Sequence, residues 1–167
     1  MSDGPDENLR DHFARWKPPR HPVRYCELSY HHPDPNFGHY ARLAAVEHAS
    51  GDLITYNDSD DALRPYHCSM LAAALDADPD AGFAISRMLQ HQREAAPVVI
   101  GRGAPGPGNT GTCMIMHRRE LLAYGTWGPP GQLEDWEIVE KWLARGIRYA
   151  VVDAETADVW PSVFTGR

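Results

Sequence analysis

Short apolar runs alternate along this chain with segments whose apolar residues recur at helical spacing. Such runs are typical of buried strands, whereas apolar residues three and four positions apart indicate the inner face of a helix. The runs predict strands over Val23–Leu28, Leu53–Tyr56, Gly82–Met88, Val98–Ile100, Thr112–His117 and Arg148–Val152. The periodic segments predict helices after Pro5, over Tyr40–Ser50, after Asp61 with Leu63 and Tyr66 facing inward, over Arg118–Tyr124 and over Glu134–Arg145. Because strands alternate with helices, we expect an α/β fold with a mostly parallel sheet flanked by helices.

Length and charge exclude several classes of protein. The 167 residues, 43% of them apolar, suit one domain with a real core. Lys and Arg total 16 against 23 Asp and Glu, a net charge of −7, which argues against a nucleic-acid binder or a polybasic membrane-surface protein. We see no apolar run long enough to span a membrane and no signal peptide, so we expect a cytoplasmic protein.

Cysteines and histidines show no ligand pattern. The three cysteines, Cys26, Cys68 and Cys113, lack CxxC spacing and fit reduced thiols, with Cys113 buried in a strand. The nine histidines also lack regular metal-ligand spacing, and we expect them at the surface.

The sharpest feature is an acidic turn, Asp58-Ser59-Asp60-Asp61, directly after the run Leu53–Tyr56. Open α/β sheets bind ligands at the carboxyl ends of their strands. Three carboxylates within four residues repel one another, and Mg²⁺ or Mn²⁺ together with phosphate oxygens would relieve that repulsion. An acidic turn that caps the next helix is the alternative, and both interpretations stay open.

A second feature is Glu134-Asp135-Trp136, where a glycine-rich loop meets the start of a helix. A carboxylate there could accept a proton from a substrate hydroxyl. Acids in a first helical turn also interact favourably with the helix dipole, so capping is again an alternative.

The order of these motifs resembles the family 2 glycosyltransferases of the GT-A fold. The segment Ala41–Asp61 carries the resemblance, with an arginine-bearing helix, Gly51-Asp52, an apolar strand and an Asp-x-Asp-Asp turn. Asp78–Ala84, Arg118–Leu122 and Glu134–Trp136 resemble later segments of the family. The likeness extends roughly from Ser2 to Pro161 and implies a GT-A-like, Rossmann-like sheet.

The resemblance implies an inverting transferase that moves a sugar from a UDP- or GDP-sugar to an acceptor hydroxyl with the help of Mn²⁺ or Mg²⁺. In the DxD motif Asp60 would hold the metal, and Asp135 would be the general base. The donor nucleotide would contact Asp3, Arg42 and Asp58. On the acceptor side we place Trp127, Glu134 and Trp136, although Trp127 could equally pack in the core, where we expect Trp142. The loop Gly101–Gly111 is expected to be mobile, either a flap over the acceptor side or a plain surface loop.

The chain also departs from the family pattern. The opening strand, helix and most of the second strand of the family have no counterpart before Asp3-Gly4. We therefore expect residues 1–167 to form a single GT-A-like domain, incomplete at its N-terminus, whose sheet a homodimer partner or another chain could complete. The late histidine ligand of the family is absent, and Asp158 could take its place. The alternative to an enzyme is a non-catalytic GT-A-like module that binds a nucleotide, a glycan or a partner protein.

Overall fold

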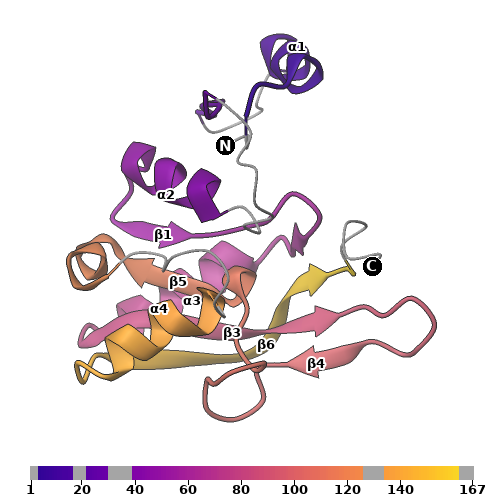
Figure 1. Cartoon of the computed structure of the whole chain (residues 1–167). Helices are drawn as coiled ribbons and strands as arrows, with labels where there is room; N and C mark the ends of the chain where they lie inside the picture. The colour runs from indigo at the N-terminus through magenta and orange to yellow at the C-terminus, as the bar shows by residue number, and fades with distance from the viewer. Residues whose placement is uncertain (1–3, 17–21, 30–38, 126–133, 162–167) are drawn as a thin grey trace. The chain divides into compact units, whose positions relative to one another are not determined.

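The computed structural model describes residues 4–16, 22–29, 39–125 and 134–161 of the chain (Figure 1). Contacts within the chain divide it into two compact units. The first consists of Met1–Ser50 with Pro129–Gly131, and the second of Gly51–Gly128 with Gln132–Arg167. A single domain over residues 1–167 stays a prediction.

The described part of the first unit contains two helices, α1 (Glu7–Arg15) and α2 (His39–His48). The predicted start of α1 is confirmed, because the Asp6 carboxylate accepts a hydrogen bond from the Leu9 backbone N–H at 3.0 Å and caps the helix. The Phe13 ring stacks on Tyr25 with their centroids 4.9 Å apart. Residues 22–29 form no strand beyond a single bridge residue, so the strand expected over Val23–Leu28 is wrong.

The second unit is built on a six-stranded sheet. Its strands are β1 (Leu53–Thr55), β2 (Ala62–Leu63), β3 (Ala81–Gln90), β4 (Val98–Ile100), β5 (Ile115–Arg118) and β6 (Arg148–Val159). The order is β1-β5-β3-β6-β2, and β4 pairs with the end of β3 as a hairpin (Figure 1). The predicted α/β class is confirmed.

Strand direction differs from the mostly parallel sheet that we expected. β3 and β6 are parallel, and the other pairs between described strands are antiparallel. After β3 the chain returns through β4 and a loop rather than through a helical crossover, so β4 and β5 lie in turn along the same edge of β3. Consequently β1, β3 and β6 run in one direction, and the intervening β5 runs in the other.

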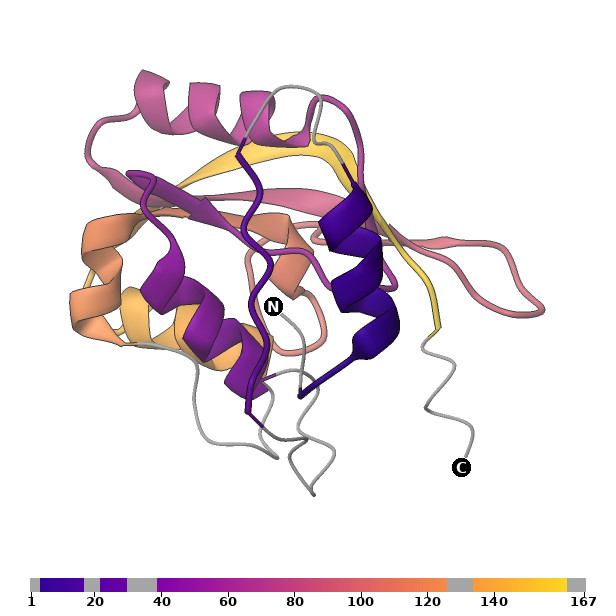
Figure 2. The same cartoon turned by 90° about the horizontal axis from the view of Figure 1, so that it is seen from above.

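Two helices cover opposite faces of this sheet (Figure 2), namely α3 (His67–Ala77) and α4 (Glu134–Leu143). Neighbouring residues of β3 alternate between the two faces, as strand geometry requires. Phe83 packs against Trp142 of α4, with ring centroids 5.2 Å apart. Ala84 joins Leu71 and Leu75 of α3 in a buried cluster. The expectation that Trp142 lies in the core is therefore confirmed.

The chain between the acidic turn and α3 is not the helix that we predicted. Leu63 lies in β2, and α3 begins only at His67. Pro65 explains the difference, because a proline disfavours helical backbone at the residue before it, here Arg64. Likewise Thr112–Met114 form a 3₁₀ turn, so that β5 begins at Ile115 rather than at Thr112.

The glycine-rich loop Gly101–Gly111 is organised by one side chain. The Asn109 carbonyl oxygen accepts from the Gly101 N–H at 2.7 Å, and the Asn109 amide donates to the carbonyls of Arg102 and Ala104, each at 2.9 Å. Gly101 has φ +93°, which favours glycine there. The loop therefore has its own internal hydrogen bonds, and its mobility and its role as a flap stay predictions.

Two buried histidines hold the end of β1, contrary to the expected surface positions. His67 Nε2 lies 3.2 Å from Thr55 Oγ1, which itself donates to the Ile115 carbonyl at 2.8 Å. Since the threonine hydrogen is used there, His67 Nε2–H is the donor. His67 Nδ1 lies 2.8 Å from Thr156 Oγ1, which is in turn 2.6 Å from Ser86 Oγ. The full burial of the His67 ring favours its neutral form.

His117 is buried in the same way, which again favours the neutral ring. Its Nδ1–H donates to the Arg118 carbonyl at 2.8 Å, and its Nε2 lies 2.8 Å from the Tyr56 hydroxyl. Burial lowers the pKa of both His67 and His117.

We predict that these histidines make the protein sensitive to mild acid. Below about pH 6.5 these histidines take up protons in the unfolded chain but not in the folded protein, where burial lowers their pKa. The free energy of unfolding therefore decreases as the pH falls. Each histidine contributes at most about 1.4 kcal/mol per pH unit. We expect His67→Gln to reduce the slope of unfolding free energy against pH, measured with urea between pH 7.5 and 5.5.

The exposed His48 supplies the matched control, since His48→Gln should leave that slope unchanged. Comparison with variants separates the histidine contribution from carboxyl groups that titrate in the same window. NMR titration of the wild-type rings needs no variant. A pKa of 6.5 or higher for both buried rings would contradict the prediction.

Candidate functional site

The acidic turn, residues 58–61, lies just after the end of β1, as predicted. The Asp61 N–H donates to the Asp58 carbonyl at 3.2 Å, and the Asn57 amide donates to the same carbonyl at 3.0 Å. Asp60 is exposed, while Asp58 and Asp61 are half-buried. The turn therefore presents three carboxylates in a compact loop at the carboxyl end of a strand.

Asp61 reports how strongly negative this region is. Its pKa is raised to about 6, first by burial and then by the charges of Asp58 and Asp60. A hydrogen bond from the Trp160 backbone N–H opposes the rise, and the charge of Asp135 adds to it. Asp135, far along the chain, is therefore within electrostatic reach of the acidic turn.

Asp135 lies in the first turn of α4, where the Thr112 hydroxyl donates a hydrogen bond to its Oδ1. Thr112 is buried in the 3₁₀ turn before β5. Sequence reasoning missed this residue, because nothing in the local pattern links positions 112 and 135. Only the folded sheet brings the turn before β5 to the start of α4.

Cys113 lies next to the same group of carboxylates. Its pKa is raised strongly, first by burial and then by the charges of Asp61, Asp58 and Asp135. The thiol therefore stays protonated and is a poor nucleophile, as expected for a buried cysteine.

Whether the acidic turn could bind a divalent cation depends on whether protein oxygens alone or phosphate oxygens of a ligand complete the coordination shell. Within the described ranges no group of three His, Cys, Asp or Glu side chains converges on one point as a metal cage. Mg²⁺ is often held by one or two carboxylates, with phosphate oxygens of the ligand completing its shell. The exposed Asp60 and the surplus charge around Asp61 suit that second arrangement.

The other predicted site residues are placed as follows. Arg42 is half-buried on α2 of the first unit, and Trp136 is half-buried in the first turn of α4. Asp3, Trp127 and the side chain of Glu134 lie outside the described residues. The roles assigned to these residues stay predictions.

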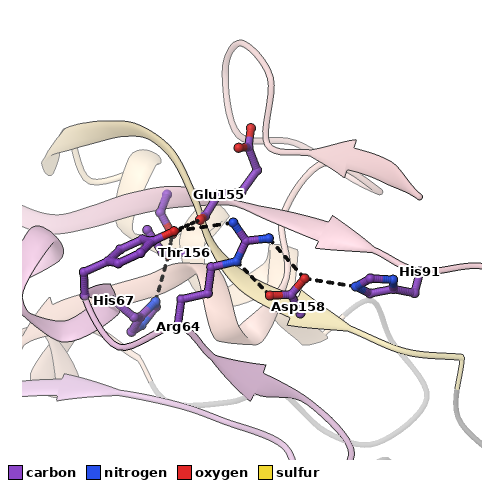
Figure 3. A network of polar contacts seen from close by, with 8 residues as sticks. Arg64, His67, His91, Glu155, Thr156 and Asp158 are labelled. Atoms are coloured by element: carbon purple, nitrogen blue, oxygen red, sulfur yellow. Dashed lines mark hydrogen bonds and ion pairs between the residues drawn. The ribbon is translucent and has the colours of Figure 1, made fainter. Parts of the chain in front are cut away.

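Asp158 does not stand ready as a substitute for a metal-binding histidine. Its carboxylate accepts from Arg64 Nε at 2.7 Å and Nη2 at 3.1 Å, and it lies 2.9 Å from His91 Nε2 (Figure 3). The Arg64 hydrogen bonds are the main reason that the pKa of Asp158 falls to about 2. This carboxylate is thus committed to an ion pair.

The helices in the described part of the chain are all too short or too polar to cross a bilayer.

Comparisons with known proteins agree with the motifs. No curated protein matches the chain. Among 54 matching chains of solved structures is the crystal structure of S. aureus TarS 1-349, with a TM-score of 0.61 and 16% sequence identity. The alignment covers 80% of this chain and 42% of that one, so the likeness concerns the fold of less than half of the matched chain. A family model described as Glycosyl transferase family 2 matches residues 2–97, more than half of the sequence. The chain therefore belongs to glycosyl transferase family 2.

Proposed function

We propose that the chain carries the donor-binding and catalytic part of an inverting glycosyltransferase. In this proposal a nucleoside diphosphate sugar, with UDP or GDP as the nucleotide, donates its sugar to an acceptor hydroxyl. Family membership supports sugar transfer in general. The observation that carries the finer proposal is the electrostatic coupling of the acidic turn to Asp135, because donor and acceptor chemistry need neighbouring carboxylates with different tasks.

On the donor side, Asp58 would contact the nucleotide and Asp60 would hold Mn²⁺ or Mg²⁺ against the diphosphate. When bound, the cation would stabilise the charge that develops on the leaving diphosphate. Two anions do not approach each other without a counterion. Asp60 is exposed, and the raised pKa of Asp61 shows that negative charge is already crowded in the turn. A cation between the turn and the diphosphate is therefore favoured.

On the acceptor side, Asp135 would accept the proton of the attacking hydroxyl. An alcohol is a weak nucleophile at neutral pH, so a carboxylate within hydrogen-bonding distance assists its attack on the anomeric carbon. The new glycosidic bond forms on one face of the sugar while the bond to the diphosphate breaks on the other, which inverts the centre. Thr112, which donates to Asp135 Oδ1, would orient the carboxylate.

The donor proposal predicts that Mn²⁺ with UDP or GDP raises the melting temperature. At a hundredfold excess over Kd the stabilisation is about 2.7 kcal/mol, which corresponds to a rise of about 5 °C or more. Asp60→Asn should abolish most of the rise. Asp76→Asn, which alters an exposed carboxylate near the end of α3, should retain it. A wild-type protein that shows no rise with either nucleotide would refute donor binding.

The base proposal predicts that Asp135→Asn retains Mn²⁺–nucleotide binding within about twofold but loses at least about 100-fold in turnover. Until an acceptor is identified, release of the nucleoside diphosphate by hydrolysis of UDP- or GDP-sugars provides the assay. Thr112→Val should lose about tenfold, because it disturbs only the orientation of the carboxylate. Undiminished turnover in Asp135→Asn would rule this residue out as the base.

A non-catalytic binding module gives a different pattern. Nucleotide binding would then persist in wild type and in Asp135→Asn alike, and no UDP- or GDP-sugar would be turned over by either.

A further inference from the structure

After the acidic turn the chain continues directly into β2, the shortest strand of the described sheet. β2 has two residues, and they pair with the end of β6 in the register Ala62 with Asp158 and Leu63 with Ala157. The Arg64 N–H extends this ladder by donating to the Thr156 carbonyl at 2.9 Å. Since β2 stands last in the strand order, its backbone pairs with one neighbouring strand within the described sheet. So short a ladder holds the turn weakly by itself.

A side-chain interaction reinforces this ladder. Arg64 and Asp158 form a two-point ion pair, Nε to Oδ2 at 2.7 Å and Nη2 to Oδ1 at 3.1 Å (Figure 3). The side chains are only 29% and 19% exposed, so water screens the pair less than it screens a fully exposed one. Two parallel N–H···O bonds fix the direction of approach as well as the distance.

The same end of β6 lies close to the turn itself. The Trp160 backbone N–H is near enough to Asp61 to lower the pKa of its carboxyl. The Trp160 ring stacks on His91 with centroids 4.7 Å apart and planes at 2°, and His91 Nε2 lies 2.9 Å from Asp158 Oδ1. Asp158 therefore joins the exit of the turn, through Arg64, to the strand end that lies near Asp61.

We propose that Arg64 and Asp158 are the positioning residues of the acidic turn. Their ion pair locks the exit of the turn onto β6 and so keeps Asp58 and Asp60 in the orientation that a nucleotide and a cation require. The locking is a property of the chain alone, whereas the ligand rests on the proposed function. Without the pair, the turn would sample conformations in which its carboxylates diverge.

The chain supplies a matched control at the other end of β6. Arg148 donates to Asp78 at 2.9 Å and to Asp80 at 3.1 Å, and so ties the start of β6 to the start of β3. Arg148→Gln removes an arginine–aspartate contact from the same strand without touching the acidic turn. Each substitution should loosen β6 at its own end, so a loss of turn order should follow only from Arg64→Gln.

Hydrogen exchange of single amides tests the locking without any ligand. The reporters are the amides at positions 64 and 61, bonded to the Thr156 and Asp58 carbonyls. We expect both to exchange about tenfold faster in Arg64→Gln and in Asp158→Asn. In Arg148→Gln they should keep the wild-type rate, while the amide of Ala81, bonded to the Asp78 carbonyl, should exchange faster.

Arg64→Lys keeps the charge but loses the two-point geometry, so it should fall between wild type and Arg64→Gln. It also preserves the test if the glutamine variant fails to fold. Unchanged exchange at positions 64 and 61 in both Arg64 variants would overturn the proposal. So would an equal acceleration at these positions in Arg148→Gln.

Binding of Mn²⁺–UDP or Mn²⁺–GDP then tests what the locking is for. If the competent turn falls to about a tenth of the population, the apparent Kd rises about tenfold, and KM for the donor rises with kcat little changed. If wild type binds neither nucleotide, the proposed function fails, and exchange alone decides on the ion pair. Faster exchange with an unchanged Kd would overturn the positioning role.

Discussion

Repulsion among the carboxylates is the constraint around which the second unit is organised. Asp58, Asp60 and Asp61 follow a strand of three residues, and Asp135 adds its charge from α4. Hydrogen bonds within the turn, from the Asp61 N–H and the Asn57 amide to the Asp58 carbonyl, act together with contacts from the rest of the unit. The entry to the turn is held by two buried histidines, His67 on Thr55 and His117 on Tyr56. The exit is held by the pairing of β2 with β6 and by the Arg64–Asp158 ion pair. The contacts at the buried entry are made by groups that need carry no charge, and the contact at the half-exposed exit is an ion pair. This division fits the free-energy cost of burying a charge.

The histidines also connect the turn to the helix that carries Asp135. His117 packs against Trp142 of α4 with ring centroids 4.9 Å apart, and Trp142 packs against Phe83 of the central strand. Thr112 adds a direct hydrogen bond to Asp135. The start of α4 is thus related to the end of β1 through the core and not only through surface loops. For a reaction in which a donor and an acceptor meet, such rigid support keeps the two sets of carboxylates at a constant separation.

Much of the site could be predicted from local pattern. The acidic turn, its place after a buried strand and the Glu-Asp-Trp start of α4 depend on neighbours in sequence, and all three lie where they were predicted. Thr112 could not be predicted, because its partner is distant along the chain. The burial of His67 and His117 was missed for a related reason. Their hydrogen-bond partners lie far away in the sequence, so the residues next to each histidine do not indicate that it is buried. The reversed direction of β5 followed from a hairpin return that the alternation of strands and helices did not indicate.

Composition and short-range order determined by themselves that this chain forms an α/β fold, carries an acidic turn at a strand end and resembles a sugar transferase. Those properties depend on backbone preferences, on hydrophobic periodicity and on residue spacing, all of which are determined by residues close together in the sequence. Only the tertiary structure decided which side chains meet. It placed Asp135 within electrostatic reach of the turn, buried two histidines in the core and paired Asp158 with Arg64. Electrostatic coupling and burial depend on distances across the fold, and those distances exist only once the sheet has assembled.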